Sequence, residues 1–364
     1  MKIREELKNK IISLCSMTSV SGFEGICEDD LVVLIGGGFD EHYKDRVGNH
    51  VFVKRCGKAN APRILVDAHY DEIGMMVTEV CDGGFLKFTN IGGIDRAILA
   101  ASDVVIHGSE TFDGVIASTP PHLRQGEEGD LPEIKDMIID TGMDKEYLLK
   151  TAPVGTPVTF RKRYTELLGG QISGASFDNK ACAAAAAYGI ERAERERLAG
   201  DVYLVLSAYE ETSHMGGISP AAFDIEPHYA MVVDVNLADC PAAPKRETVT
   251  LGEGVSISKS AATDKRLTEA TERLCKDKDI AFSIIAAASS TGTNAASLNI
   301  IRAGVPVVDV GLPLKNMHTY NEVISLDDAL TLRRLIEEFV CSRELAEEFG
   351  RTVELFDEEV SYGK

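Results

Sequence analysis

The fold of this chain is limited above all by a change of pattern that begins near residue 73. From there onward, short runs of alternating apolar and polar residues are separated by Gly, Asp and Pro, as in a small all-β unit. On either side, compact apolar runs such as residues 63–68 alternate with helix-like segments such as residues 179–197, which is typical of an α/β fold. The sequence therefore predicts an α/β domain of residues 1–72 and 165–364, into which a β domain of residues 73–164 is inserted.

Further helices are predicted from apolar residues that recur with the helical period. One of them begins near Ser325, where Ser325 and Asp328 resemble a capping box. The others are predicted at residues 4–17, 24–35, 265–276 and 293–302.

The charge and the cysteine content argue against several classes of protein. The chain has 58 Asp and Glu against 38 Lys and Arg, a net charge of −20, whereas nucleic-acid binders need clustered Lys and Arg. Its longest apolar run, residues 181–190, is about half as long as the ~20 residues that cross a bilayer, and the first residues lack the apolar core of a signal peptide. The eight cysteines are dispersed, as in proteins that keep reduced thiols. We therefore expect a cytoplasmic protein with no nucleic-acid or membrane partner.

Acidic and histidine side chains follow the predicted strands, at the point where each strand ends. In open α/β sheets, ligands bind in the crevice outside the carboxyl ends of the strands. A further acidic residue stands in the loop GASFDNK, just before a predicted helix. The candidate functional residues are His69, Asp71, Asp178, Glu210, Glu211, Asp234 and His318.

Each of these residues also has a simple structural explanation. A histidine after a strand often has a structural hydrogen bond, and Asp178 could cap the helix that follows it. Asp234 could be a solvated turn residue. The Glu210–Glu211 pair is different, because it directly follows a largely apolar run, where burying two adjacent charges is unfavourable. The pair is therefore the strongest single indication of function.

Taken together, two histidines and four carboxylates at strand ends are the residues that a two-metal hydrolytic site needs. Divalent ions such as zinc, cobalt and manganese accept nitrogen and oxygen ligands of these kinds. Two ions about 3.5–4 Å apart can hold a water molecule, lower its pKa and polarise a carbonyl oxygen. One glutamate is then left to carry a proton from the water to a leaving group.

The order of these residues and their surroundings resemble the tetrahedral aminopeptidase family, which includes glutamyl and deblocking aminopeptidases and members once labelled endoglucanases. The resemblance covers essentially the whole chain, and it rests on an ordered set of motifs. These are Ser21-Gly22-Phe23-Glu24, His69-Tyr70-Asp71-Glu72-Ile73-Gly74, Ile91-Gly92-Gly93, Pro120-Pro121-His122, Gly174-Ala175-Ser176-Phe177-Asp178-Asn179, Glu210-Glu211, Asp234-Val235-Asn236, Gly292-Thr293-Asn294-Ala295 and Gly304-Val305-Pro306 through Met317-His318.

The resemblance implies two divalent metal ions per subunit. It implies that His69, Asp178 and Asp234 hold one ion and that Asp178, Glu211 and His318 hold the other, so that Asp178 bridges them. Zinc, cobalt and manganese are all candidates, and the ligand types do not distinguish between them.

The same resemblance implies that Glu210 is the general acid/base and that Asp71 hydrogen-bonds the far ring nitrogen of His69 and fixes its tautomer. It implies a mixed-sheet, three-layer catalytic domain of the zinc-peptidase type, with the inserted domain a small, β-barrel-like dimerisation unit. Dimers of such enzymes assemble into a hollow tetrahedral dodecamer that admits short peptides. The expected activity is the removal of N-terminal residues from short peptides.

The sequence departs from the family pattern near the predicted site. Lys180 stands where an arginine is usual, and the two side chains are not equivalent in bidentate hydrogen bonding. Residues 212–215 and 315–317 also differ from the common pattern. None of these positions is a predicted metal ligand or the base, so we expect an active enzyme. The sequence does not indicate which N-terminal residue of a peptide it prefers.

Other functions stay open at this point. N-deacylation of a small amide uses a similar metal site, although its ligand segments look less like these. Glycoside hydrolysis needs two carboxylates that flank one bond, whereas Glu210 and Glu211 are adjacent on a strand extension and would point in opposite directions. A catalytically silent, peptide-binding assembly would lack a ligand or the base, and none is missing.

Overall fold

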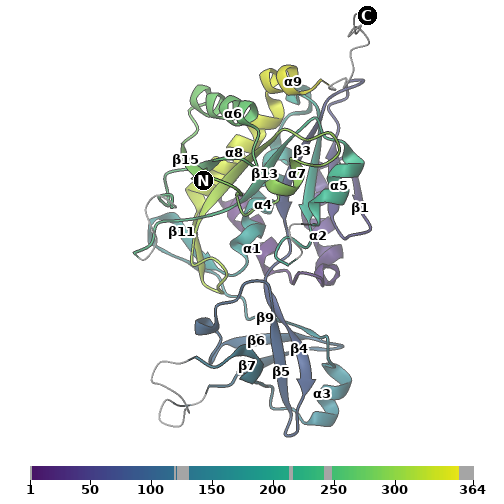
Figure 1. The fold of residues 1–364 in the computed structure, drawn as a ribbon, viewed down its shortest axis with the longest axis vertical. Helices are drawn as coiled ribbons and strands as arrows, with labels where there is room; N and C mark the ends of the chain where they lie inside the picture. Colours follow the sequence, from purple (N-terminus) through teal and green to yellow (C-terminus); the bar gives the residue numbers. More distant parts are fainter. Residues whose placement is uncertain (1, 119, 121–130, 213–215, 242–247, 352–364) are drawn as a thin grey trace, which may run out of the picture.

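The computed structural model consists of an α/β part and a smaller β-barrel part (Figure 1). The chain leaves the α/β part after β3 (Arg63–His69) and returns to it after β9 (Pro157–Phe160). No helix of the described residues is both long enough and apolar enough to cross a membrane. The structure describes residues 2–118, 120, 131–212, 216–241 and 248–351; residues 121–122 and 213–215, which fall in segments discussed above, lie outside them.

The α/β part is built on one mixed sheet of eleven strands. Its centre is parallel and consists of β12 (Asp201–Ser207), β3, β13 (Tyr229–Leu237) and β16 (Val307–Lys315). The other strands are β1 (Glu41–Lys44), β2 (His50–Lys54), β10 (Thr165–Glu166), β11 (Gln171–Gly174), β14 (Val255–Ser260), β15 (Phe282–Ala287) and β17 (Glu322–Ser325). The order is β1-β2-β12-β3-β13-β16-β17-β11-β10, with β14 beside β16 and β15 beside β14.

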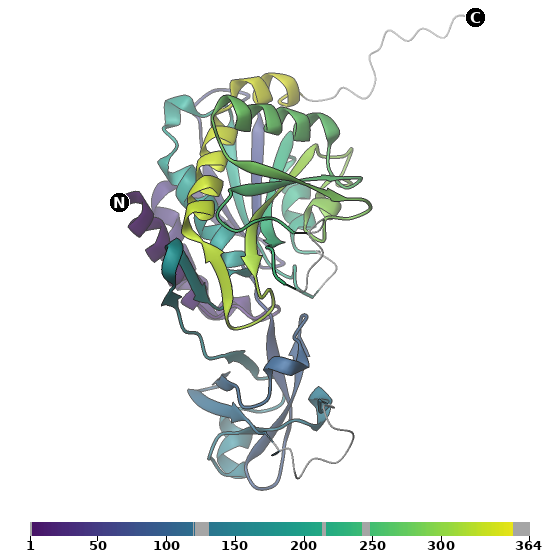
Figure 2. The same ribbon diagram turned by 90° about the vertical axis from the view of Figure 1, so that its left-hand side faces the viewer.

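Helices cover both faces of this sheet, which gives the α/β part three layers (Figure 1, Figure 2). Successive residues of a strand point to opposite faces, and β3 illustrates this. Its Val66 shares one core with Leu332 of α8, and its Leu65 shares another with Leu298 of α7. The helices are α1 (Lys2–Ser16), α2 (Glu28–Ile35), α4 (Phe177–Arg192), α5 (Ile218–Ile225), α6 (Lys265–Asp277), α7 (Ala295–Leu298), α8 (Leu326–Cys341) and α9 (Arg343–Phe349).

Helix α4 lies in the middle of one layer, where α1 and α8 pack against it. Its alanine run, residues 183–187, is completely buried, because side chains this small let neighbouring elements approach closely. The N-terminus of α4 lies at the carboxyl ends of the parallel strands. The Ala-rich composition therefore fixes the start of α4 against the edge of the sheet where the predicted site lies.

The barrel part closes on itself in the order β4-β5-β8-β7-β6-β9, so it leaves no free sheet edge among these strands. Alternating residues such as Val77, Phe88 and Ile106 fill its own core. The barrel lies beyond the carboxyl end of β3 (Figure 1). Its elements are β4 (Gly74–Val80), β5 (Phe85–Ile91), β6 (Asp103–His107), β7 (Thr111–Ile116), β8 (Ile139–Asp140), β9 and α3 (Lys145–Thr151).

The predicted fold class, an α/β domain with a mixed sheet and a small β-barrel, is confirmed, whereas the domain boundaries stay a prediction. The helix expected at residues 293–302 was too long, since α7 covers only Ala295–Leu298. The side chains of Thr293 and Asn294 bond to buried Asp309 and Asp67, which holds the preceding residues outside the helix. Short elements such as β14, β17 and α5 were not predicted.

The predicted start of the last long helix is confirmed, with one difference. Ser325 accepts the backbone N–H groups of Asp327 and Asp328. The carboxylate of Asp328 does not close a capping box; it accepts the N–H groups of Gly252 and Gly254 at 2.7 and 2.8 Å. Asp328 therefore holds a loop against the helix start.

Two stacked histidines lie at the edge of the sheet, on β1 and β2. Strand β2 pairs with β12, the strand that precedes the Glu210–Glu211 turn. His42 of β1 and His50 of β2 have ring centroids 5.2 Å apart, and His42 Nε2 is 3.0 Å from His50 Nδ1. His50 is completely buried, and its Nε2 has no partner among the described residues. Burial lowers the pKa of His50 to about 4 and also lowers the pKa of His42.

We predict that this pair makes the free energy of unfolding decrease as the pH falls from about 6.5 to about 4. In that range the unfolded chain binds a proton that His50 in the folded chain does not, so stability is lost on acidification. The loss would reach about 3 kcal/mol at most. A His50→Phe variant keeps a ring without a titrating group and should lose this share of the pH dependence. Urea unfolding of both proteins at about pH 7 and about pH 4.5 measures it, and equal pH dependence would contradict the prediction.

Candidate metal centre

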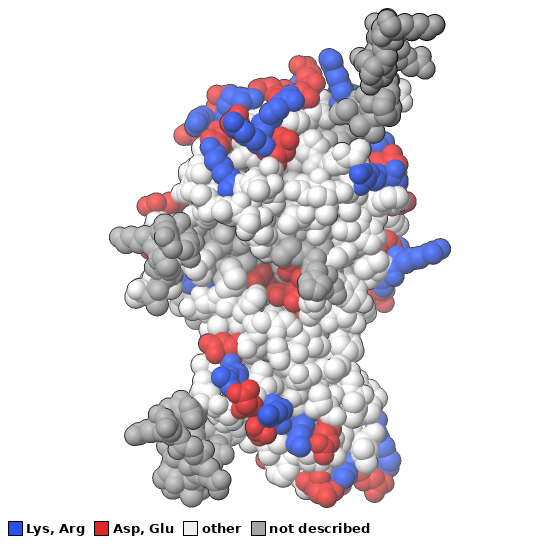
Figure 3. All heavy atoms as spheres, viewed as in Figure 1, with Lys and Arg blue, Asp and Glu red and all other residues white. Residues whose placement is uncertain are grey.

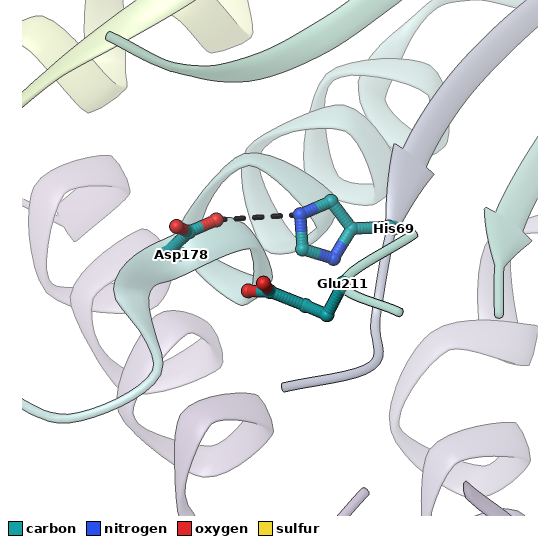
Figure 4. A group of neighbouring side chains, drawn as sticks. All are labelled: His69, Asp178 and Glu211. Carbon is teal, nitrogen blue, oxygen red and sulfur yellow. Dashed lines mark ion pairs between the residues drawn. The ribbon is translucent and has the colours of Figure 1, made fainter. Parts of the chain in front are cut away.

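Three side chains from separate elements meet at the edge of the sheet that faces the barrel. His69 is the last residue of β3, Glu211 lies in the turn after β12, and Asp178 stands in the first turn of α4. One ligand atom of each lies within 4.8 Å of the others (Figure 4). They meet because parallel strands end at the same edge and because α4 begins there.

The carboxylate of Asp178 lies between the two predicted histidines. Its Oδ1 is 3.3 Å from Nε2 of His69, and its Oδ2 is 3.4 Å from Nε2 of His318. The N-cap of α4 is Ser176, the backbone of Asp178 is not helical, and the Asp178–Asn179 peptide bond is cis. Asp178 is therefore not the helix cap that its position allows; each of its oxygens faces a different histidine.

The other candidate residues complete the cluster around these histidines. Nε2 of His69 lies 3.6 Å from Oδ1 of Asp234 and 3.8 Å from Oε2 of Glu210. Nε2 of His318 lies 3.5 Å from Oε2 of Glu211. The candidate residues thus form one cluster, in which Asp178 lies beside both histidines and Glu211 lies near both as well.

Asp71 connects the end of β3 to the Glu210–Glu211 turn. Its carboxylate accepts the backbone N–H groups of Glu210 and Glu211, both at 3.1 Å. Nδ1 of His69 is 3.1 Å from the backbone oxygen of Asp71 and 3.5 Å from its Oδ1. The ring therefore bonds mainly to the backbone of Asp71, and this leaves Nε2 to face the acidic residues.

Burial raises the pKa of several carboxylates in the cluster. It raises the pKa of Glu210 to about 7 and those of Glu211 and Asp234 well above their usual range. Burial also disfavours the charged form of Asp178, but its hydrogen bonds to the two histidines outweigh this and hold its pKa below the usual range. Among the residues that the structure describes, no Lys or Arg forms an ion pair with any of the four.

The histidines respond to this negative charge. Burial disfavours the charged form of His69, but Glu210 and Asp234 outweigh it and raise its pKa well above the usual value. The hydrogen bond with Asp178 raises the pKa of His318. A bound metal ion takes the place of such imidazole protons. Imidazole nitrogens and carboxylate oxygens are ligands of zinc, cobalt and manganese, so the residues present fit a divalent metal centre.

Two further acidic residues hold the segments around the cluster, and neither was predicted to take part. Glu72 accepts a hydrogen bond from the buried ammonium group of Lys162 at 2.6 Å and forms an ion pair with that of Lys180 at 3.0 Å. Burial opposes ionisation of Glu72, but the two lysines outweigh it and lower its pKa to about 2. Glu322 accepts the backbone N–H of Asp178. Glu72 stands in a recognised motif, but its partner Lys162 lies 90 positions later.

A small pocket opens beside the cluster, and both parts of the molecule line it. Its inner wall includes Asp178, Glu211 and His318. On its outer side, Phe160 of the barrel packs against Tyr320 of the α/β part, with ring centroids 5.0 Å apart. A group of acidic side chains is visible at the surface at the level where the two parts meet (Figure 3). The pocket therefore lies beside the centre, at the junction of the two parts.

Comparisons with known proteins give one consistent result. A lysyl aminopeptidase from Pyrococcus furiosus is 28% identical over 332 residues, which are 89% of this chain and 92% of the relative. The structure of an aminopeptidase from the archaeon Desulfurococcus kamchatkensis is 26% identical, with a TM-score of 0.88 over 96% of this chain and 99% of that one. The TET1 peptidase of Pyrococcus horikoshii, described as able to assemble into a tetrahedron or a large octahedral shell, is 26% identical, with a TM-score of 0.81 over 92% and 99%.

The family model described as M42 glutamyl aminopeptidase matches residues 48–335. This match includes all seven candidate residues, both parts of the fold and both crossings between them. The chain therefore belongs to the M42 glutamyl aminopeptidase family.

Proposed function

We propose that this protein is a dinuclear metal-dependent aminopeptidase that removes N-terminal residues from short peptides. The observation that carries the proposal is the position of Asp178, whose two oxygens lie 3.3 and 3.4 Å from ring nitrogens of His69 and His318. A carboxylate between two histidines suits a ligand that bridges two ions. Membership of an aminopeptidase family supports the class of reaction.

In this proposal His69, Asp178 and Asp234 hold one divalent ion, and Asp178, Glu211 and His318 hold the other. When bound, the ions lower the pKa of a water molecule and polarise the carbonyl group of the peptide bond. Zinc, cobalt and manganese all suit these ligands, so a binding measurement has to identify the metal.

Glu210 is the group that we propose moves the proton. Its carboxylate lies 3.8 Å from Nε2 of His69, and the bond from its backbone N–H to Asp71 fixes its position. A carboxyl group whose pKa is about 7 can accept a proton from the attacking water near neutral pH and then donate it to the leaving amine. Burial, which raises this pKa, therefore suits Glu210 to both steps.

The charges at the site favour a substrate with a free amino group over an N-acylated one. Two bound divalent ions would balance the charge of the four carboxylates, so the rest of the pocket lining has to provide any partner for the further carboxylate that an N-acyl amino acid brings. Among the described residues that line the pocket, the only Lys or Arg is Lys162. Its ammonium group is already bound by Glu72 and by the carbonyls of Cys15 and Met17. This favours an aminopeptidase over an N-deacylase.

The remaining alternatives have less support. A glycosidase needs two carboxylates on opposite sides of one bond, whereas Glu210 faces His69 and Glu211 faces His318. A silent binding protein has no need of the full set of ligands and a buried base, all of which this chain has.

We also propose that the protein self-associates through the barrel part, as a dimer-based dodecamer. The barrel part exposes large apolar side chains, among them Leu149 at 54% and Val154 at 65%, and such side chains suit an interface. The description of the TET1 peptidase as a tetrahedron or an octahedral shell gives this proposal further support.

We predict that Glu210→Gln lowers kcat for aminoacyl p-nitroanilides by about 100- to 10,000-fold, because the amide cannot accept the proton. The variant should still bind two ions, since Glu210 is not one of the proposed ligands. Release of p-nitroaniline measures kcat, and calorimetry with cobalt counts the ions. Glu211→Gln is the matched comparison. It should lose activity, and calorimetry should show one bound ion in place of two, because Glu211 is a proposed ligand. Full activity of Glu210→Gln would contradict its role as the base.

Removal of the metal should abolish activity, and added cobalt, zinc or manganese should restore it. Asp178→Asn should lower the affinity for both ions, because the residue belongs to both proposed ligand sets. Asp234→Asn should lower the affinity for only one of them. Calorimetric titration of the metal-free proteins distinguishes these results. Binding of a single ion by the unmodified protein would contradict the dinuclear proposal. Turnover of N-acyl amino acids but not of aminoacyl p-nitroanilides would favour the N-deacylase.

A double variant, Leu149→Asp with Val154→Asp, should reduce the assembly to smaller species. Burying an unpaired carboxylate in an apolar interface costs more free energy than the contact provides. Light scattering after gel filtration measures the mass, and circular dichroism verifies the fold. Val33→Asp is the matched control, since Val33 is an apolar residue of α2 that is 84% exposed, and it should leave the mass unchanged. An unchanged mass in the double variant would contradict assembly through this surface.

A further inference from the structure

Glu322, the first residue of β17, lies where three segments of the α/β part meet. It is only 2% exposed. Within the sheet it pairs with Gly174, the last residue of β11, and the chain continues from there into α4. On its other side, residues 316–321 lead from β16 into β17 and carry His318. Glu322 is therefore next to both segments that supply the Asp178–His318 contact.

A single carboxylate bonds to both segments. Oε2 of Glu322 accepts the backbone N–H groups of Phe177 at 2.7 Å and Asp178 at 3.2 Å. Its Oε1 accepts the backbone N–H of His318 at 3.2 Å. Both oxygens of this one side chain therefore accept hydrogen bonds, and together they bind three backbone N–H groups.

In the segment that leads into the regular part of α4, Glu322 accepts backbone N–H groups, as an N-cap side chain does at a regular helix start. The first N–H groups of a helix need acceptors from outside the helix. Ser176 is the N-cap residue, but its side chain makes no cap bond, and its hydroxyl bonds to Glu72 instead.

The histidine segment depends on bonds of this kind as well. His318 has φ 61° and Asn316 has φ 59°, in the left-handed region that residues other than glycine rarely adopt. The N–H bond from His318 to Glu322 holds one of these two residues in place.

We propose that Glu322 is a positioning residue that fixes Asp178 relative to His318 and so sets the affinity for the second metal ion. This inference rests on the proposed dinuclear site, in which Asp178, Glu211 and His318 hold that ion. The described structure shows no hydrogen bond from Glu322 to His69 or Asp234, which stand on β3 and β13. Glu322 bonds to the backbone N–H groups of two of the three proposed ligands of that ion, Asp178 and His318, but of only one ligand of the other ion, Asp178. Loss of Glu322 therefore weakens the binding of one ion more than the binding of the other.

The test is stepwise cobalt binding to metal-free Glu322→Gln, measured by calorimetry and by the visible spectrum of bound cobalt. Glutamine has nearly the same shape, but its amide NH₂ must face a backbone N–H in place of one oxygen. We expect the ion held by His69, Asp178 and Asp234 to lose less affinity than the other, because Glu322 bonds to only one of its ligands, Asp178. The ion held by Asp178, Glu211 and His318 should bind about 10- to 100-fold more weakly. Mutation of other residues that hydrogen-bond a metal ligand has an effect of this size. Excess cobalt should then restore most of the p-nitroanilidase activity, which a misfolded protein would not recover.

Asp328→Asn is the matched control. Asp328 is also a completely buried carboxylate that accepts backbone N–H groups near a helix start, but it contacts none of the proposed ligands. This variant should lose stability in urea while both cobalt affinities stay unchanged.

The outcomes separate the inference from the function on which it rests. The unmodified protein has to bind two ions for the proposed function to stand. If Glu322→Gln then binds both ions as tightly as the unmodified protein, or if its affinity for both ions falls by the same factor, the positioning role is wrong and the proposed function stands. If the unmodified protein binds fewer than two ions, the proposed function fails and this inference with it. Selective weakening of the second ion, absent from Asp328→Asn, establishes the role.

Discussion

The structure around the site depends on holding four buried carboxylates within a few ångströms of two histidines. Like charges at such distances in a poorly solvated place repel strongly, and no lysine or arginine of the described residues forms an ion pair with these carboxylates. Two features make the cluster possible. The histidines stand between the acidic groups, and the acids come from separate strand ends and from the start of α4, so that no single segment carries the whole repulsion. The parallel centre of the sheet is what brings these ends to one place.

A second set of acidic residues, outside the central cluster, stabilises this arrangement. Asp71, Glu72 and Glu322 contact mainly the backbone or the lysines of the segments that carry the candidate ligands. Each therefore fixes a chain segment instead of adding to the central cluster. Asp71 and Glu72 stand two and three positions after His69, so three of the four residues 69–72 serve the site in different ways. This explains why a segment of irregular structure keeps one geometry at the edge of the sheet.

Much of this could be read from the sequence, and the limits have physical reasons. His69 and the Glu210–Glu211 pair follow long apolar strands, so their place at one sheet edge follows from pattern alone. Glu322 begins a strand of only four residues, and its partners depend on pairing with Gly174, far away in the sequence. The helix after Thr293 was predicted too long for a related reason. Its helical periodicity is a local signal, whereas the bond from Thr293 to buried Asp309 is not.

The lysine at position 180 shows how a departure from a family pattern can be accommodated. A lysine is a point charge and cannot replace the fork of an arginine by itself. Here Lys180 approaches Glu72 from the α4 side, while Lys162 reaches the same carboxylate from the return crossing between the two parts. Both ammonium groups also bond to the carbonyl of Met17. Because Glu72 itself lies on the outward crossing, one buried ion cluster joins both crossings to the start of α4. A shift of the barrel against the α/β part would thus strain the same bonds that hold the segment of Asp178 in place.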